Sequence, residues 1–246
     1  MLIFLGGFAN LIKKKQYYIA PILFAITAYT LCNMENQSSA ITIFLSLAVF
    51  AFVYLFGKRA IKTIALGAII ACIAIPITFK NMDYAKMYEN IPKIPNSASE
   101  TRLFIWHFVA TKASEKPLLG WGFNASRDIP VKESDFMQDG RHPLPLHPHN
   151  GLLQMWLELG LVGIILYACF LLSLLKRIGE IKTNTSNCLT KINGNLNSYN
   201  KNTDMALFSG LMAAYFTIGQ TGFGIWQNWW LASGVIVLAM LKIAKE

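Results

Sequence analysis

The side chains best suited to chemistry lie in a polar stretch between two apolar blocks, residues 80–151. Its most informative members are Arg102, Arg127, Arg141, His142, His147 and His149. A guanidinium group stays charged and pairs with phosphate through two parallel hydrogen bonds. An imidazole near its ordinary pKa can accept a proton at neutral pH. Together these residue types predict a site that handles a phosphate-bearing substrate.

The residues after His149 predict how a helix would present it. Asn150, Gln154 and Glu158 are spaced four apart, so they stack on one face of a helix that begins here. His149 then lies at the N-terminal edge of that helix, where anions are favoured. Glu158 falls about two turns into an apolar segment, and an ionisable group at that depth is functional by default.

Two of these features also have a simpler interpretation. His147 and His149 have the spacing of a metal pair, but they flank a proline and no carboxylate lies at ligand spacing. No metal site is therefore predicted. Arg102 is equally compatible with an ion pair to Glu100 on a solvated helix face.

The tryptophans fall into two groups. Trp106 and Trp121 lie in the polar stretch and are typical of packing or interface anchors as well as of sugar-stacking platforms. The second group, near the C-terminus, is interpreted as an aromatic belt at the membrane surface and consists of Trp226, Trp229 and Trp230.

The composition of the chain indicates which kind of structural element positions these residues. The chain has 246 residues, of which 54% are hydrophobic and 14% charged, and its mean hydropathy is +0.41. Soluble domains carry about 25% charged residues, and one membrane crossing takes roughly 20 apolar residues. Apolar segments at 17–34, 40–56, 64–79, 152–175 and 205–241, the last dividing near 222–228, predict five to six transmembrane helices. The stretch 2–12 reads as a truncated helix or an interfacial segment.

The chain has a net charge of +9, and its basic residues are spread unevenly, in a pattern that follows the predicted membrane topology. Basic residues concentrate at 13–15, 58–62, 176–201 and 242–245, in alternate connections, and such connections lie in the cytoplasm. The polar stretch 80–151 is nearly balanced in charge and is expected to face outward. A nucleic-acid partner is therefore not predicted, whereas membrane lipids are.

The polar stretch is expected to be ordered and partly helical. Residues 99–116 carry helical periodicity and end at Pro117. The run Gly120–Gly122 predicts a turn at which backbone can approach a ligand closely, and a short helix is expected near 131–137. We divide the chain into N-terminal spans (1–79), the loop (80–151) and C-terminal spans (152–246), with a flexible linker near 178–203.

Several short motifs follow one another in this loop. They are Arg102-Leu-Phe-Ile-Trp106, Pro117-Leu-Leu-Gly-Trp-Gly122, His149-Asn150 and the later pair Gly160 and Gly163. In this order the motifs resemble the O-antigen ligase and polymerase superfamily, over a region from about residue 36 to the C-terminus. The resemblance implies an all-α integral protein of the bacterial inner membrane with its large loop in the periplasm.

The resemblance also implies an activity. Such a ligase moves a glycan from an undecaprenyl-diphosphate carrier to the lipid A–core, without cofactor or metal. His149 would activate the acceptor hydroxyl or, alternatively, position the acceptor or the carrier, and Arg102 would hold the leaving diphosphate. The substrate-binding residues would be Arg127, Arg141, His147, Asn150, Gln154, Glu158 and Trp106.

Other functions stay open at this point. Within the superfamily, an O-antigen polymerase or a protein O-glycosyltransferase is the alternative. From other classes come a transporter component and a non-catalytic fragment. Relatives have about twice as many spans, so a missing N-terminal half is a candidate partner.

Overall fold

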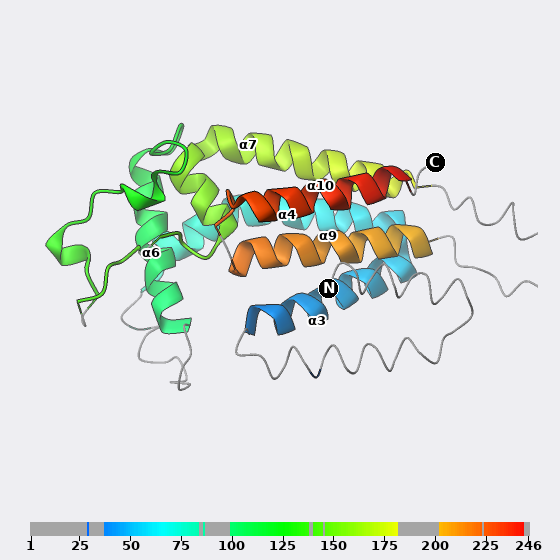
Figure 1. Ribbon diagram of the computed structural model, residues 1–246, viewed down its shortest axis with the longest axis horizontal. Helices are drawn as coiled ribbons and strands as arrows, with labels where there is room; N and C mark the ends of the chain where they lie inside the picture. Colours follow the sequence, from blue (N-terminus) through cyan, green and yellow to red (C-terminus); the bar gives the residue numbers. More distant parts are fainter. Residues whose placement is uncertain are drawn as a thin grey trace, which may run out of the picture. The chain divides into compact units, whose positions relative to one another are not determined.

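The computed structural model describes residues 37–83, 99–137, 140–144, 146–181, 202–222 and 224–243, together with Tyr29 and Lys86. Every regular element within these residues is a helix (Figure 1). The α-helices are α3 (Gln37–Phe56), α4 (Lys58–Lys80), α6 (Ser99–Glu115), α7 (Gly151–Gly179), α9 (Thr203–Thr221) and α10 (Asn228–Ile243). Two short 3-10 turns, η1 (Ala125–Arg127) and η2 (Glu133–Asp135), lie in the loop between α6 and α7.

Helices occur at most of the predicted positions. The long apolar block 205–241 divides as expected, because α9 ends at Thr221 and α10 begins at Asn228. The expected helix near 131–137 is reduced to the single turn η2. The predicted segments 2–12 and 17–34 lie outside the described residues apart from Tyr29, as does most of the linker, while α7 continues to Gly179.

Among the described residues, two helices, α4 and α7, are long and apolar enough to cross a membrane, which is consistent with a membrane protein. Large apolar side chains are exposed along both helices, including Leu66, Ile70 and Ile73 on α4 and Ile165 and Leu166 on α7. Such a continuous apolar face is uncommon on soluble monomers and suits a lipid environment.

The chain forms two compact units. The described residues of the first are 37–65, 173–181, 202–218 and 232–243, with Tyr29. Its core gathers apolar residues of α3, α4, α7 and α9 around Val53, Ala60, Ile178 and Ala206, each fully buried. A tight turn at Gly57, with φ of 54°, joins α3 directly to α4, and glycine adopts this left-handed conformation without steric cost.

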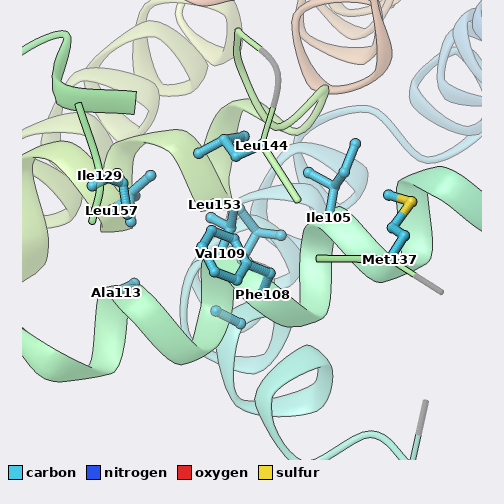
Figure 2. Packing of buried hydrophobic residues seen from close by; sticks show 10 residues of the cluster. Ile105, Phe108, Val109, Ala113, Ile129, Met137, Leu144, Leu153 and Leu157 are labelled. Carbon is cyan, nitrogen blue, oxygen red and sulfur yellow. The ribbon is translucent and has the colours of Figure 1, made fainter. Parts of the chain in front are cut away.

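The second unit contains residues 66–172 and 219–231 and therefore carries all the candidate site residues. Its core is shown in Figure 2. From α6 come Ile105, Phe108, Val109 and Ala113, spaced so that they share one face of the helix. They pack against Leu153 and Leu157 of α7 and against Ile129, Met137 and Leu144 of the loop.

Burying a side chain of this size stabilises a fold by about 1.5–3 kcal/mol. The three loop residues Ile129, Met137 and Leu144 belong to the same core as α6 and α7. The described residues of the loop are therefore held by a hydrophobic core that they share with α6 and α7.

Candidate active site

Helix α7 is broken near its start, at a position that the sequence does not mark as a helix end. Gly160 has φ of 60° and ψ of −154°, which interrupts the helix between Glu158 and Leu161 (Figure 1). The span predicted over 152–175 lies within α7, and the break inside it was not predicted from the sequence. The short first segment of α7 carries Gln154 and Glu158, and the long second segment carries the apolar face.

The loop after α6 satisfies the backbone groups that the break leaves free. The N–H groups of Trp121 and Gly122 donate to the carbonyls of Leu157 (2.8 Å) and Glu158 (3.0 Å). In the other direction, the N–H groups of Leu161 and Val162 donate to the carbonyls of Pro117 (2.8 Å) and Leu118 (3.2 Å). Backbone that is non-helical at membrane depth must find its hydrogen bonds within the protein. The segment Pro117–Gly122 supplies them.

Glycines permit this close approach. A Cβ atom on Gly160 would lie 2.6 Å from the backbone of Leu118, and one on Gly120 would lie 2.4 Å from the backbone of Glu158. The sequence predicted that the backbone at Gly120–Gly122 approaches a ligand closely. In the structure, the backbone at Gly120 lies close to the backbone of α7.

The first segment of α7 begins directly after His149-Asn150, as predicted. The Asn150 side chain accepts a hydrogen bond from the N–H of Leu153 at 3.1 Å and so caps the helix. Gln220, at the end of α9, accepts from the N–H of Leu152 at 2.9 Å. Two of the free N–H groups at this helix start are thus used within the protein.

His149 is held in a left-handed backbone conformation, with φ of 51°. Among the described residues other than glycine, only Asn124 shares a positive φ. Such conformations are sparsely populated for residues with a side chain, and they concentrate at functional sites. The conformation aims the His149 ring at the connection between α9 and α10.

One hydrogen bond determines the tautomer of His149. Its Nδ1 lies 3.3 Å from the carbonyl oxygen of Gly222. A carbonyl can only accept, so Nδ1 carries the proton, and in the neutral ring Nε2 is left with a lone pair. Burial lowers the pKa of His149, the positive charge of Arg102 lowers it further, and the Gly222 carbonyl opposes both. At neutral pH the ring is therefore uncharged and can accept a proton at Nε2.

His147 lies beside His149, with 4.3 Å between the ring centroids. Its Nε2 is buried and has no hydrogen-bond partner among the described residues. Burial lowers the pKa of His147 to about 4, with smaller contributions from His149 and from the positive charge of Arg127. His147 is therefore neutral at the pH at which His149 would work.

The arginines reach this pair from different elements. Arg102 lies half-buried on α6 and acts on His149 through its charge, while Arg127, exposed on η1, acts on His147. Arg141 donates to the Thr101 hydroxyl at 2.9 Å, which brings it to the residue next to Arg102. The charge of Arg102 thus acts on His149 and that of Arg127 on His147, while Arg141 lies at the start of α6.

Trp106 fixes the segment that carries the histidines. Its indole N–H donates to the carbonyl oxygen of Pro148 at 2.8 Å. Pro148 is fully buried between His147 and His149. The Trp106 ring also packs edge-on against Phe79, with 4.9 Å between centroids. Of the two interpretations offered by the sequence, these contacts favour an anchor.

Glu158 is fully buried, at 0% exposure, and its carboxylate accepts four hydrogen bonds. Ser126 Oγ and Gln154 Nε2 (3.1 Å) donate to Oε1. The Asn124 backbone N–H (3.1 Å) and the Trp226 indole N–H donate to Oε2. A carboxylate offers about four acceptor sites, so the group is fully satisfied. Glu158 joins α7 to the loop and to the α9–α10 connection.

Gln154 completes this network. While its Nε2 donates to Glu158, its Oε1 accepts from the N–H of Ile225 at 3.1 Å. Asn150, Gln154 and Glu158 were predicted to share a helix face, and the hydrogen bond from Gln154 to Glu158 agrees with that spacing. All three make hydrogen bonds to protein groups. Among the described residues, no three His, Cys, Asp or Glu side chains are grouped as metal ligands.

Comparison with known proteins identifies the family. The family described as O-antigen ligase matches residues 22–168 of this chain. The chain belongs to the O-antigen ligase family. The resemblance inferred from the loop motifs is thereby confirmed. No solved structure matches the chain.

Relatives of this O-antigen ligase family member come from Rickettsia. Proteins of Rickettsia felis and Rickettsia bellii, both named "Putative polysaccharide ligase", are 34% and 35% identical to it over 227 and 238 residues. These alignments cover 91% and 96% of this chain but 51% and 54% of the relatives. The chain thus spans about half the length of the curated relatives it matches.

Sequence reasoning did not identify three residues that build the site of this ligase-family chain. Trp226 was interpreted as part of an aromatic belt, yet its indole N–H is bonded to the buried Glu158. Ser126 and Gln220 were not singled out at all, although they bond to Glu158 and to the start of α7. Their partners are more than 30 residues away, so no local pattern could have revealed them.

Proposed function

We propose that this chain carries the periplasmic active site of a glycosyltransferase that moves a glycan from a polyprenyl-diphosphate carrier to a sugar hydroxyl of the lipid A–core, in the bacterial inner membrane. The observation that carries the proposal is the His149 ring. Its Nδ1 is bonded to the Gly222 carbonyl, its Nε2 has a lone pair, and an arginine charge is near.

In the proposed reaction, His149 is the general base. Its Nε2 accepts the proton of the acceptor hydroxyl while the hydroxyl oxygen attacks the anomeric carbon of the donor glycan. The bond between that carbon and the diphosphate oxygen breaks, and the lipid diphosphate leaves with the electron pair. Direct attack of this kind inverts the configuration at the anomeric carbon.

The developing negative charge needs cationic partners. Arg102 is proposed to hold the diphosphate, because its charge acts on His149 and its guanidinium can pair with phosphate bidentately. Arg127 stands beside His147 and is proposed as a second phosphate ligand, with Arg141 as a third. The unpartnered Nε2 of His147 suits a hydrogen bond to a substrate hydroxyl.

A lipid carrier also needs an apolar site. A cavity of about 530 Å³ lies among α4, α6 and α7, within the second unit. Its walls are almost entirely apolar and include Ile73, Pro76, Ile165 and Ala168, while Lys80 is its one charged residue. Such a cavity fits a hydrocarbon chain, and an ammonium group at its wall suits a phosphate nearby. We propose that the isoprenoid chain of the donor occupies it.

Complementation tests the proposed function. A strain that lacks its O-antigen ligase would receive this chain or its His149→Ala variant at equal membrane abundance. Polymer-bearing lipopolysaccharide with the wild-type chain only is the expected result. Restoration by both forms would overturn the role of His149.

The products distinguish the alternatives within the family. Accumulated carrier-linked polymer in the uncomplemented strain, cleared by the wild-type chain, indicates ligation. A polymerase would leave that polymer in place and would instead restore polymer in a strain that lacks its O-antigen polymerase and accumulates carrier-linked single repeat units. If neither form restores the polymer, co-expression with the part of a Rickettsia relative that this chain does not match tests whether that part is a required partner.

A further inference from the structure

The α9–α10 connection is clamped onto the first segment of α7. Trp226 donates to Glu158, the Ile225 N–H donates to Gln154 at 3.1 Å, and Gln220 accepts from Leu152 at 2.9 Å. The connection also lies close to the start of α7 at Gly151, since a Cβ atom on this residue would lie 2.8 Å from the Ile225 side chain.

The same connection presents the Gly222 carbonyl to Nδ1 of His149. Gly222 has no bond to α7 among the interactions described, so its position follows from that of its neighbours in the chain. Those neighbours are held by Glu158, directly through Trp226 and indirectly through Gln154. A fully buried carboxylate is costly unless its hydrogen bonds are complete, and completing them here requires the connection to be in place.

We propose that Glu158 and Trp226 are positioning residues that hold the α9–α10 connection so that the Gly222 carbonyl fixes the His149 tautomer with Nε2 free. This inference rests on the proposed role of His149 as the base. Neither residue touches the reacting atoms; both act through the connection. Without the clamp, the carbonyl moves away, the proton can shift to Nε2, and the ring loses its acceptor toward the hydroxyl.

The variants separate this role from general stability. Trp226→Phe removes the indole N–H, keeps an aromatic ring against Phe123 and leaves every charge unchanged. Glu158→Gln keeps the shape of the side chain. Its NH2 group, however, cannot accept hydrogen bonds, so the two donors that bond to one carboxylate oxygen of Glu158 are left without an acceptor. Trp156→Phe is the matched control for the His149 tautomer alone, because its indole N–H donates to the Cys72 carbonyl at 2.8 Å, away from the connection, while its ring lines the apolar cavity.

The tautomer can be measured without turnover. The full chain, labelled with 15N-histidine and placed in lipid bilayers, would be studied by solid-state NMR. The chain has four histidines, and single substitutions assign their signals. His149 is expected to carry its proton on Nδ1 in the wild type and in Trp156→Phe, and to show the Nε2-protonated form in Trp226→Phe and Glu158→Gln. An unchanged His149 tautomer in both variants would overturn the proposal, as would the same change in Trp156→Phe.

Transfer activity gives the second measurement. Trp226→Phe is expected to lower the rate by about tenfold or more, since an imidazole in the other tautomer cannot act as the base.

The pH profile of the transfer rate should change as well. The charged and titratable groups that influence His149 are His147 in its own segment and Arg102 on α6, while Arg127 acts on His147. None of these changes in Trp226→Phe. Loss of the Gly222 bond lowers the pKa of His149, so the acid limb of the pH profile should also move to lower pH.

The two measurements distinguish the failures. A changed His149 tautomer with unchanged activity would support the positioning role of Glu158 and Trp226, but it would refute the role of His149 as the base. An unchanged tautomer refutes the clamp, whatever the activity.

Discussion

The backbone carbonyl of Glu158 accepts a hydrogen bond from the N–H of Gly122 at 3.0 Å, while the side chain of the same residue accepts one from the indole of Trp226. One residue thus connects the break in α7 to the connection that contacts His149. The motifs Pro117–Gly122 and His149-Asn150 lie 27 or more residues apart in the sequence, and α7 brings them into one network. Changes at the break should therefore affect the site as well as stability.

Gly160→Ala is expected to destabilise the protein. At positive φ with an extended ψ of −154°, a conformation that is essentially limited to glycine, a residue with a side chain costs about 1–3 kcal/mol, and the new Cβ would lie 2.6 Å from the backbone of Leu118. Gly67→Ala is the control, because nothing lies within 4 Å of a Cβ there and Gly67 is in the helix α4. Thermal unfolding in detergent, followed by tryptophan fluorescence, measures both. Equal unfolding midpoints for the two variants would contradict the role of the break.

Arg102→Lys is expected to lower transfer activity by about 10- to 100-fold, the equivalent of one charged hydrogen-bond contribution. Lysine keeps the charge but loses the fork that pairs with phosphate. Arg59→Lys makes the same substitution at the exposed start of α4, outside the site, and should leave activity unchanged. The rate is measured in membranes with lipid-linked glycan as the donor. Full activity of Arg102→Lys would exclude bidentate phosphate binding by this residue.

The pH profile of transfer should show an acid limb with its midpoint below pH 6.5. Burial and the charge of Arg102 lower the pKa of His149, so the ring stays neutral, and able to accept a proton, at a pH where an ordinary histidine is charged. Activity is lost only as the pH falls through that lowered value. The rate divided by KM, measured from pH 4 to 8, tests this. A midpoint above 6.5 would argue against His149 as the base.

His147 should make the protein less stable in mild acid. Its pKa in the folded protein is about 4, whereas an unfolded chain has about 6.5. Between these values the unfolded state binds the proton and the folded state does not, so stability falls as the pH drops from 6.5 to 4. Unfolding midpoints across this window should vary less in His147→Asn than in the wild type. The same slope in both proteins would show that another group is responsible.

Filling the apolar cavity should weaken binding of the lipid carrier. Ala168→Trp places an indole in the cavity among α4, α6 and α7. We expect KM for the lipid-linked donor to rise while kcat is largely retained, because the chain contributes to binding and not to the reaction at the sugar. Phe170→Trp adds a similar ring to the exposed face of α7, away from the cavity, and should leave KM unchanged. If Ala168→Trp also leaves KM unchanged, the carrier lies elsewhere.

Much of this protein was determined by its sequence alone. The apolar blocks gave the positions of α3, α4, α7, α9 and α10, because helix formation next to lipid depends mainly on local composition. The loop helix α6 followed from periodicity and from Pro117, and the family followed from the order of the short motifs. The position of His149 at a helix start also followed, because Asn150 and the spacing after it are local features.

Only the tertiary structure decided how these parts meet. The break in α7 depends on backbone groups of Pro117–Gly122, and the tautomer of His149 depends on the carbonyl of Gly222, 73 residues later. Trp226 could be read from the sequence only as an interfacial aromatic, because its partner is the buried carboxylate of Glu158 on another helix. Such contacts join residues distant in the chain, and their geometry is set by packing, which local sequence patterns do not encode.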